Sequence, residues 1–173
     1  MADSGVLKMS GLWPEPNTLI VKLWASSSAV DTDFSVKLID VYPPNEDYPD
    51  GYAMNLADGI IRARYRNSFE KGELMQPGEI YEITIEPPPT SNLFKKGHCL
   101  RVDISSSNYP AYDPNPNTGE PYMSGDMNIV AENAIYHDAK YPSHIIFPII
   151  PNPPESPDSE RIYFNKQSYF GDR

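Results

Sequence analysis

Proline and glycine interrupt this sequence so often that few stretches are long enough to form a helix. The chain has 19 prolines and 10 glycines among its 173 residues. Proline removes a backbone hydrogen-bond donor and breaks a helix interior, and glycine weakens one. Between the interruptions, apolar residues often alternate with polar ones, which is the pattern of half-buried strands. We therefore predict a chain of short strands in which helix is a minor component.

Seven or eight segments have strand-like sequences, and they do not alternate with helices as a parallel sheet would require. The candidates are 19–24, 34–42, 52–56, 60–65, 80–85, 99–104, 129–136 and 144–150. We interpret residues 57–59 as the turn between the third and fourth segments, and Pro148 places the last one at a sheet edge or a bulge. The spacing predicts an all-β fold, an antiparallel β-sandwich or jelly roll.

The clearest strand is 99–104, and it leads directly into a loop rich in proline and asparagine. Leu100, Val102 and Ile104 share one face of this strand, so we expect that face to meet a core and the other to meet water or a partner. The following loop, 109–121, contains four prolines, which restrict φ and remove donors. We predict that it is a rigid loop displayed on the surface.

The formal net charge of −10 argues against two classes of partner. Nucleic acids and anionic membrane surfaces are bound through clustered lysine and arginine, so we expect neither partner. No apolar run approaches the roughly 20 residues that span a bilayer, and residues 1–12 lack the pattern of a signal peptide. The single cysteine, Cys99, excludes an intrachain disulfide and favours a reducing compartment. We expect a soluble, untargeted, cytoplasmic chain.

Three arginines recur at every second position near the end of the segment 60–65. Arg62, Arg64 and Arg66 alternate with apolar residues, so a strand would project all three from one face. Such a stripe is a candidate binding surface. The alternative is a solvated face on which the arginines pair with carboxylates of this acidic chain.

No residue pattern indicates catalysis. The Gly-x-Ser-x-Gly elbow of a serine hydrolase on an α/β sheet is missing from the sequence. The two Ser-Ser-Ser runs, 26–28 and 105–107, follow strands and are interpreted as turn residues that bind backbone groups. His137, Asp138 and His144 are close in sequence, but a turn with hydrogen-bonded imidazoles explains them as well as a metal site or a triad fragment. We predict no catalytic residue.

The sequence also predicts no metal and no cofactor. The loop 113–120 is rich in oxygen ligands, but its glycine and its acidic residues do not have the spacing of an EF-hand, which leaves a structural calcium ion in a β-sandwich loop as the alternative. Asp31 and Asp33 are interpreted as turn caps rather than metal ligands. Trp13, Trp24 and the 12 tyrosines are candidates for a sugar-binding face, although aromatic residues in a β-rich chain more often belong to a core or an interface.

Several of these segments resemble a known family. They include Asp103-Ile104-Ser105-Ser106-Ser107-Asn108-Tyr109-Pro110 and Asn115-Pro116-Asn117-Thr118-Gly119-Glu120-Pro121. Further segments with the same resemblance are 23–29, 31–34, 37–43, 55–66, 77–79, 90–98, 136–138 and 142–144. Together they resemble, in order over residues 18–150, the C-terminal domain of the X-Pro dipeptidyl-peptidase and cocaine esterase (CocE/NonD) family of serine hydrolases.

The resemblance implies a jelly roll of galactose-binding-domain-like fold. In the family, the Ser-His-Asp triad belongs to an α/β-hydrolase domain that this chain does not match, so no catalytic residue is assigned to it. The implied role is a non-catalytic domain that packs on the α/β-hydrolase domain, shapes its substrate pocket and serves subunit contacts in a homo-oligomer. The alternatives are a free-standing carbohydrate-binding module and a purely structural or oligomerisation domain.

Under this reading the candidate interface combines the arginine stripe with the loop 108–121. Its residues are Arg62, Arg64, Arg66, Asn108, Tyr109, Asn115 and Asn117. We divide the chain into a lead-in at 1–17, a jelly-roll domain at 18–150 and a tail rich in proline and acids at 151–173. We also expect the chain to be either a piece of a longer enzyme or a natural truncation whose sandwich lacks one edge strand. An unpaired edge would favour association with another chain.

Overall fold

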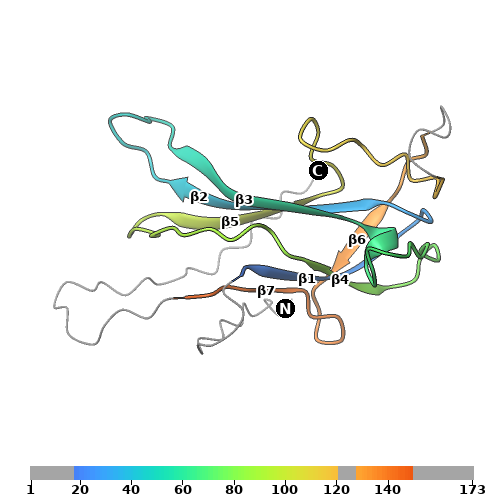
Figure 1. Ribbon diagram of the computed structural model, residues 1–173. Helices are drawn as coiled ribbons and strands as arrows, with labels where there is room; N and C mark the ends of the chain where they lie inside the picture. Colours follow the sequence, from blue (N-terminus) through green and yellow to red (C-terminus); the bar gives the residue numbers. More distant parts are fainter. Residues whose placement is uncertain (1–17, 121–127, 150–173) are drawn as a thin grey trace.

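The computed structural model describes residues 18–120 and 128–149, and these form two antiparallel sheets that face each other (Figure 1). This confirms the predicted β-sandwich. The elements are β1 Ile20–Ser27, β2 Asp33–Tyr42, β3 Tyr52–Arg62, the 3-10 turn η1 Ala63–Tyr65, β4 Tyr81–Ile85, β5 Cys99–Ser105, β6 Asn133–Tyr136 and β7 His144–Ile146. The predicted lead-in at 1–17, Trp13 and the tail at 151–173 lie outside the described residues. Within the described ranges, no helix has the length and apolar character that a membrane span requires.

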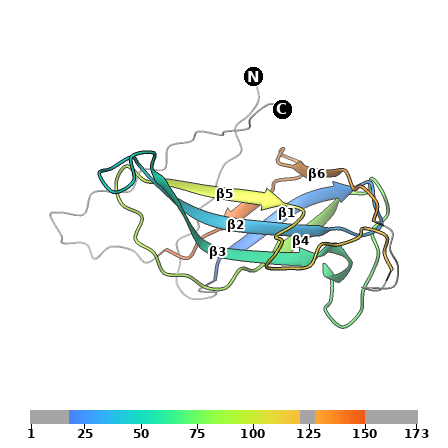
Figure 2. The ribbon, with the colours of Figure 1, turned by 90° about the horizontal axis from the view of Figure 1, so that it is seen from above.

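The two sheets are organised around β1 and β2. In the first sheet, β4 and β7 both pair with Val21, so they lie on opposite sides of β1. β6 continues along the β7 side by pairing with Trp24–Ser27. In the second sheet, β2 lies between β3 and β5, as the view from above shows (Figure 2). Every strand pair is antiparallel.

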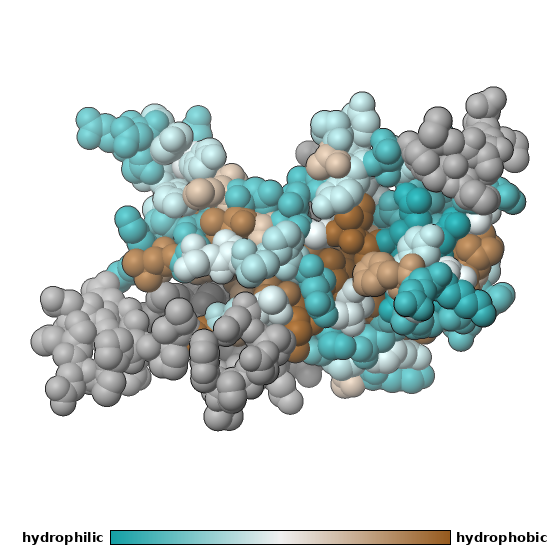
Figure 3. Space-filling model, viewed as in Figure 1, coloured by the Kyte–Doolittle hydropathy of each residue, from teal (hydrophilic) through white to brown (hydrophobic). Residues whose placement is uncertain are grey.

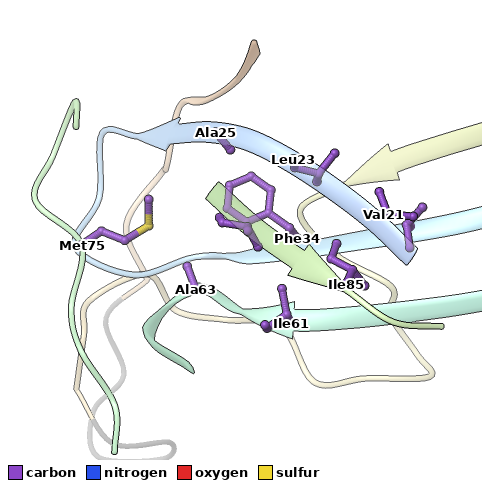
Figure 4. Packing of buried hydrophobic residues seen from close by; sticks show 10 residues of the cluster. Val21, Leu23, Ala25, Phe34, Ile61, Ala63, Met75 and Ile85 are labelled. Carbon is purple, nitrogen blue, oxygen red and sulfur yellow. The ribbon is translucent and has the colours of Figure 1, made fainter. Parts of the chain in front are cut away.

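The core lies between β1 and β2 and follows their alternation. Val21, Leu23 and Ala25 point inward from β1, and Phe34 points toward them from β2 (Figure 4). Met75, from the segment before β4, closes one end of this cluster with only 1% of its surface exposed. Burying side chains of this size stabilises a fold by about 1.5–3 kcal/mol each, so this alternation specifies which face of each strand points inward.

The prediction of two strands around a turn at residues 57–59 is wrong. Residues 52–62 form the single strand β3, with an irregularity where its pairing with β2 shifts at Leu38/Ile39. Gly59 pairs with Val36 inside this strand. A Cβ at Gly59 would lie 3.1 Å from the Cα of Pro87 and 3.2 Å from Cγ2 of Ile85. The glycine is therefore required by the close approach of another segment, a use that a turn signal in the sequence does not distinguish.

β5 is less buried than its alternation predicts. Leu100, Val102 and Ile104 face the core side, because they pair with inward positions of β2. Leu100 and Val102 are half-buried, but Ile104 is 40% exposed. β5 is an edge strand of the second sheet among the described strands, with β2 as its neighbour. The last strand, β7, ends at Ile146, and its predicted continuation through Pro148 does not pair.

The serine runs act as turn residues, as predicted. Ser27 Oγ accepts a hydrogen bond from the backbone N–H of Ala29, and Ser28 Oγ accepts one from Glu132. In the second run, Ser105 Oγ accepts a hydrogen bond from the backbone N–H of Ser107. Each hydroxyl thus satisfies a backbone donor where a strand ends.

Candidate functional site

The three arginines do not project from one strand, because β3 ends at Arg62. Arg64 lies within η1, and Arg66 follows it with its backbone N–H bound to the carbonyl of Ala63. The carbonyl of Thr32 accepts a hydrogen bond from the N–H of Ala63, which holds this turn against the start of β2. Of the three arginines, only Arg62 therefore belongs to the strand, and the predicted common strand face does not form.

Each arginine is paired with a carboxylate of the chain itself. Arg62 binds Asp33 through Nε and Nη2, at 3.0 and 3.3 Å. Arg64 Nε lies 2.8 Å from Asp31 Oδ2, and the backbone N–H of Arg64 donates to the other oxygen of Asp31 at 3.0 Å. Arg66 donates to the carbonyl of Glu73 at 2.6 Å, and its Nη2 lies 3.6 Å from Glu73 Oε1. Its guanidinium carbon lies 4.2 Å from the ring centre of Tyr81.

Burial makes the two aspartate pairs structurally important. The side chain of Asp31 is 0% exposed and that of Asp33 is 4% exposed. A buried carboxylate without partners would strongly destabilise the fold. Arg62 and Arg64 are therefore needed to neutralise the two buried aspartates. The hydrogen bond from Arg62 to Asp33 raises the pKa of Arg62 above its usual value, while partial burial opposes that rise. Asp33 thus holds Arg62 at the end of β3, and Asp31 holds Arg64 in the turn η1.

The proline-rich loop is anchored to this ion-pair network. Asn115 Nδ2 donates to Asp33 Oδ1 at 2.8 Å and to Asp31 Oδ2 at 3.0 Å. Arg64 Nη2 donates to the carbonyl of Glu120 at 3.1 Å. The structure therefore brings together the arginines and the loop that the sequence identified separately. We call Asp31, Asp33, Arg62, Arg64 and Asn115 the anchoring network.

Other contacts hold the rest of the loop. Asn117 adopts a left-handed φ of 65°, and its Nδ2 donates to the carbonyl of Ile129 at 2.8 Å. Asn108 is buried and donates to Asp58 Oδ2 at 2.8 Å. Tyr109, in contrast, is 72% exposed. The described part of the loop, residues 108–120, rises above the second sheet on the upper right of Figure 1 as an ordered surface feature.

A hollow of about 340 Å³ lies where this loop meets the sheet. It is lined by Asp33, Ile60, Arg62, Tyr65, Tyr112 and Asp113. Sequence reasoning missed Tyr65, Tyr112 and Asp113, because nothing in the local pattern shows that the loop folds back over β3. On the face drawn in Figure 3, strongly hydrophobic side chains reach the surface at the foot of the loop.

A second buried polar cluster was also missed. His98 Nδ1 lies 2.9 Å from Asp40 Oδ1, and Asn92 Nδ2 donates to Asp40 Oδ2 at 3.1 Å. The side chains of Asp40 and His98 are 0% and 8% exposed. This cluster ties the connection that precedes β5 to the end of β2. Asp40 lies within an apolar strand, and a buried aspartate requires a hydrogen-bond partner, so the sequence did carry a sign of this cluster.

The histidine segment is a turn, as predicted. Asp138 Oδ1 accepts the backbone N–H groups of Lys140 and Tyr141, each at 2.8 Å. His144 Nδ1 donates to the carbonyl of Pro142 at 2.7 Å. The backbones of His137 and Pro142 form an isolated antiparallel β-bridge. Within residues 18–120 and 128–149, no group of three or more histidines, cysteines or acids is placed to hold a metal ion.

The rings around Trp24 do not form a flat platform for a sugar, whereas in the β2–β3 hairpin the exposed Tyr48 and Tyr52 stack on each other, with ring centres 4.9 Å apart and planes inclined by 29°. Trp24 is half-buried and lies against Tyr141, with the ring centres 5.4 Å apart and the planes inclined by 50°. Tyr136 meets Tyr141 at 59°. A stacking platform needs rings that are coplanar and exposed, so this cluster is typical of packing rather than of carbohydrate binding.

Comparison with known proteins gives one consistent result. Residues 18–146 match the family described as the X-Pro dipeptidyl-peptidase C-terminal non-catalytic domain. The chain is 46% identical over 135 residues to the cocaine esterase of Rhodococcus sp. (strain MB1 Bresler), which covers 77% of this chain and 22% of the esterase. The chain thus spans about a fifth of the length of that relative.

Two solved structures have a similar fold over the same region. One is an aminopeptidase from the marine sediment archaeon Thaumarchaeota archaeon, with a TM-score of 0.69 and 34% identity. The other is an α-amino acid ester hydrolase, with a TM-score of 0.68 and 34% identity. In both cases the similarity covers 74% of this chain and 22% of the other.

Proposed function

Because the chain belongs to the family of X-Pro dipeptidyl-peptidase C-terminal non-catalytic domains, we propose that it packs on the α/β-hydrolase domain of a larger hydrolase. In that position it helps to shape the substrate pocket and contributes no catalytic group of its own. The observation that carries the proposal is the match of residues 18–146 to a domain described as non-catalytic and C-terminal. We further propose that the sandwich is a jelly roll of galactose-binding-domain-like fold.

The anchoring network supports a docking role for the loop 108–120. An interface loop that is ordered before binding loses little conformational entropy when its partner arrives. Asn115 and Arg64 hold this loop through contacts with Asp31, Asp33 and Glu120. Tyr109 remains 72% exposed beside these anchors, and tyrosine is enriched in protein interfaces. We propose the loop and the adjacent arginines as the docking surface.

The free edge of the second sheet supports a second role, in subunit contacts. β5 pairs only with β2 among the described strands, and its inward residue Ile104 is 40% exposed. An unpaired strand edge with apolar side chains favours association with another chain. We propose that β5 contributes to a homo-oligomer.

The test of docking mixes this 173-residue chain with the separately produced α/β-hydrolase domain of a related hydrolase. We expect binding by calorimetry and an increase in turnover of an aryl ester by the catalytic domain. Replacing Tyr109 with serine should weaken the binding, while the matched change Tyr48→Ser, in the β2–β3 hairpin, should not. Hydrolysis of an aryl ester or X-Pro peptide by this chain alone would contradict the proposal, as would failure of the two domains to bind.

A further inference from the structure

The hollow beside the loop is built from three parts of the fold. β2 and β3 contribute Asp33, Ile60 and Arg62, and the turn η1 contributes Tyr65. The loop completes it with the neighbouring residues 112 and 113. Because Asn115 ties the loop to Asp33 at 2.8 Å, this arrangement is present before any partner binds.

The charges that line the hollow leave one carboxylate available. Arg62 and Asp33 bind each other through two hydrogen bonds, so each already has a partner of opposite charge. Asp113 is exposed, and its carboxylate has no ion pair with any cation in the described ranges. The lining therefore carries one positive and two negative charges, which favours a cation over an anion.

The remaining lining suits a flat cation on an alkyl stem. Tyr112 is 43% exposed and Tyr65 is half-exposed, so both rings are accessible from the hollow. The faces of aromatic rings attract cations, and a guanidinium also stacks on them because it is planar and weakly hydrated. Ile60 provides apolar surface for the stem.

We propose that this hollow receives the guanidinium group of an arginine side chain from the catalytic domain, held by Asp113 and the rings of Tyr65 and Tyr112. The inference rests on the proposed docking function and names the chemistry of one contact in it. Arg62, Arg64 and Arg66 are already paired with Asp33, Asp31 and Glu73, so their part in the docking surface is to hold the loop and the turn in place. The surface contributes a receptor for a positive charge.

The test of the site uses a small probe and its neutral isostere. Butylguanidinium and butylurea have the same shape and differ in charge, so each is titrated into the 173-residue chain and followed by amide chemical shifts. We expect butylguanidinium to shift the amides of residues 65, 112 and 113, and butylurea to leave them unchanged. Asp113→Asn should weaken probe binding about threefold, which is the size of a solvent-exposed ion pair.

Matched variants separate the site from general charge effects. Glu46→Gln removes the same charge from the β2–β3 hairpin, at the far end of the sheet, and should leave probe binding unchanged (Figure 1). Tyr112→Phe keeps the ring and should retain binding, while Tyr112→Ala should lose about threefold. Equal responses to the two probes, or equal effects of Asp113→Asn and Glu46→Gln, would overturn the proposal.

The same variants distinguish this inference from the docking proposal. We expect Asp113→Asn to weaken the association with the catalytic domain about threefold as well. Domain association that is unaffected by Asp113→Asn overturns the arginine contact and leaves docking intact. If the probe binds but the two domains do not associate, the docking function is overturned. The assignment of the arginine to the catalytic domain is then overturned as well.

Discussion

Asn115 and Asp33 are 82 residues apart in the sequence, and their side chains are joined by a hydrogen bond of 2.8 Å from Nδ2 to Oδ1. The same Nδ2 donates to Asp31 at 3.0 Å. Asn115 therefore connects the proline-rich loop to two buried carboxylates that already hold arginines. This contact makes the loop part of the sandwich.

Replacing Asn115 with leucine should reduce the free energy of unfolding by about 1–3 kcal/mol, because two buried carboxylate oxygens lose a donor. Urea unfolding of the variant measures this loss. As a control, Asn128→Ala changes an exposed asparagine and should alter stability by less than about 0.5 kcal/mol. Equal effects of the two changes would show that the loop is not anchored through Asn115.

Gly59→Ala should destabilise the fold by about 1–3 kcal/mol, because the new Cβ would lie 3.1 Å from the backbone of Pro87 and force a shift in the core. Thermal or urea unfolding measures the change. Gly72→Ala is the matched control, since the Cβ there would meet only the flexible side chain of Arg64 at 3.3 Å and an edge of Tyr65 at 3.5 Å. A Gly59→Ala variant as stable as Gly72→Ala would argue against close packing at β3.

The stability of the chain should decrease above about pH 10 in part through Tyr81. Burial raises the pKa of Tyr81, the hydrogen bond from the backbone N–H of Gln76 lowers it, and the hydrogen bond to Glu79 raises it again, with a net rise. A pKa raised by folding means that the unfolded state loses its proton first. The contribution of Tyr81 to the free energy of unfolding is therefore complete below its pKa in the unfolded chain, and it is lost as the pH rises through its pKa in the folded chain.

Unfolding in urea at about pH 9 and about pH 11 tests this, since these values bracket the tyrosine titration. Tyr81→Phe should reduce the loss of stability between the two, whereas Tyr109→Phe, at a tyrosine that is 72% exposed, should not. Ultraviolet absorbance of tyrosinate should show one fewer late-titrating group in the Tyr81 variant. Identical pH profiles for the two variants would contradict the role of Tyr81.

Ile104→Lys should weaken self-association without a large loss of stability, because Ile104 is 40% exposed at the free edge of the second sheet. A lysine that points inward from an edge strand opposes pairing with another edge. Sedimentation velocity over a range of protein concentrations, under reducing conditions that keep Cys99 free, measures the change. Phe69→Lys changes an apolar residue that is 84% exposed away from this edge and serves as the control. Association equally sensitive to both changes would exclude β5 as the contact.

Most of the strands could be predicted from alternation alone. The period of two in segments such as 34–42 reports which side chains face the core, and the frequent prolines limit helices, so the β-sandwich followed from local pattern. The single strand β3 could not be predicted, because a glycine that makes a turn and one that admits a neighbouring backbone look alike in sequence. β3 ends where the turn η1 begins, with the N–H of Arg66 bound to the carbonyl of Ala63, and the sequence pattern does not show this turn either.

The sequence by itself determined the sheet-forming pattern, the excess negative charge and the motifs shared with a family of non-catalytic domains, since these depend on the order of residue types. Only the tertiary structure decided which charges are available for binding. Arg62 and Arg64 are occupied by Asp33 and Asp31, and Asp113 is left exposed beside two tyrosines. That outcome depends on which distant side chains come within about 3 Å of each other, because the strength of ion pairs and hydrogen bonds depends on distance and burial.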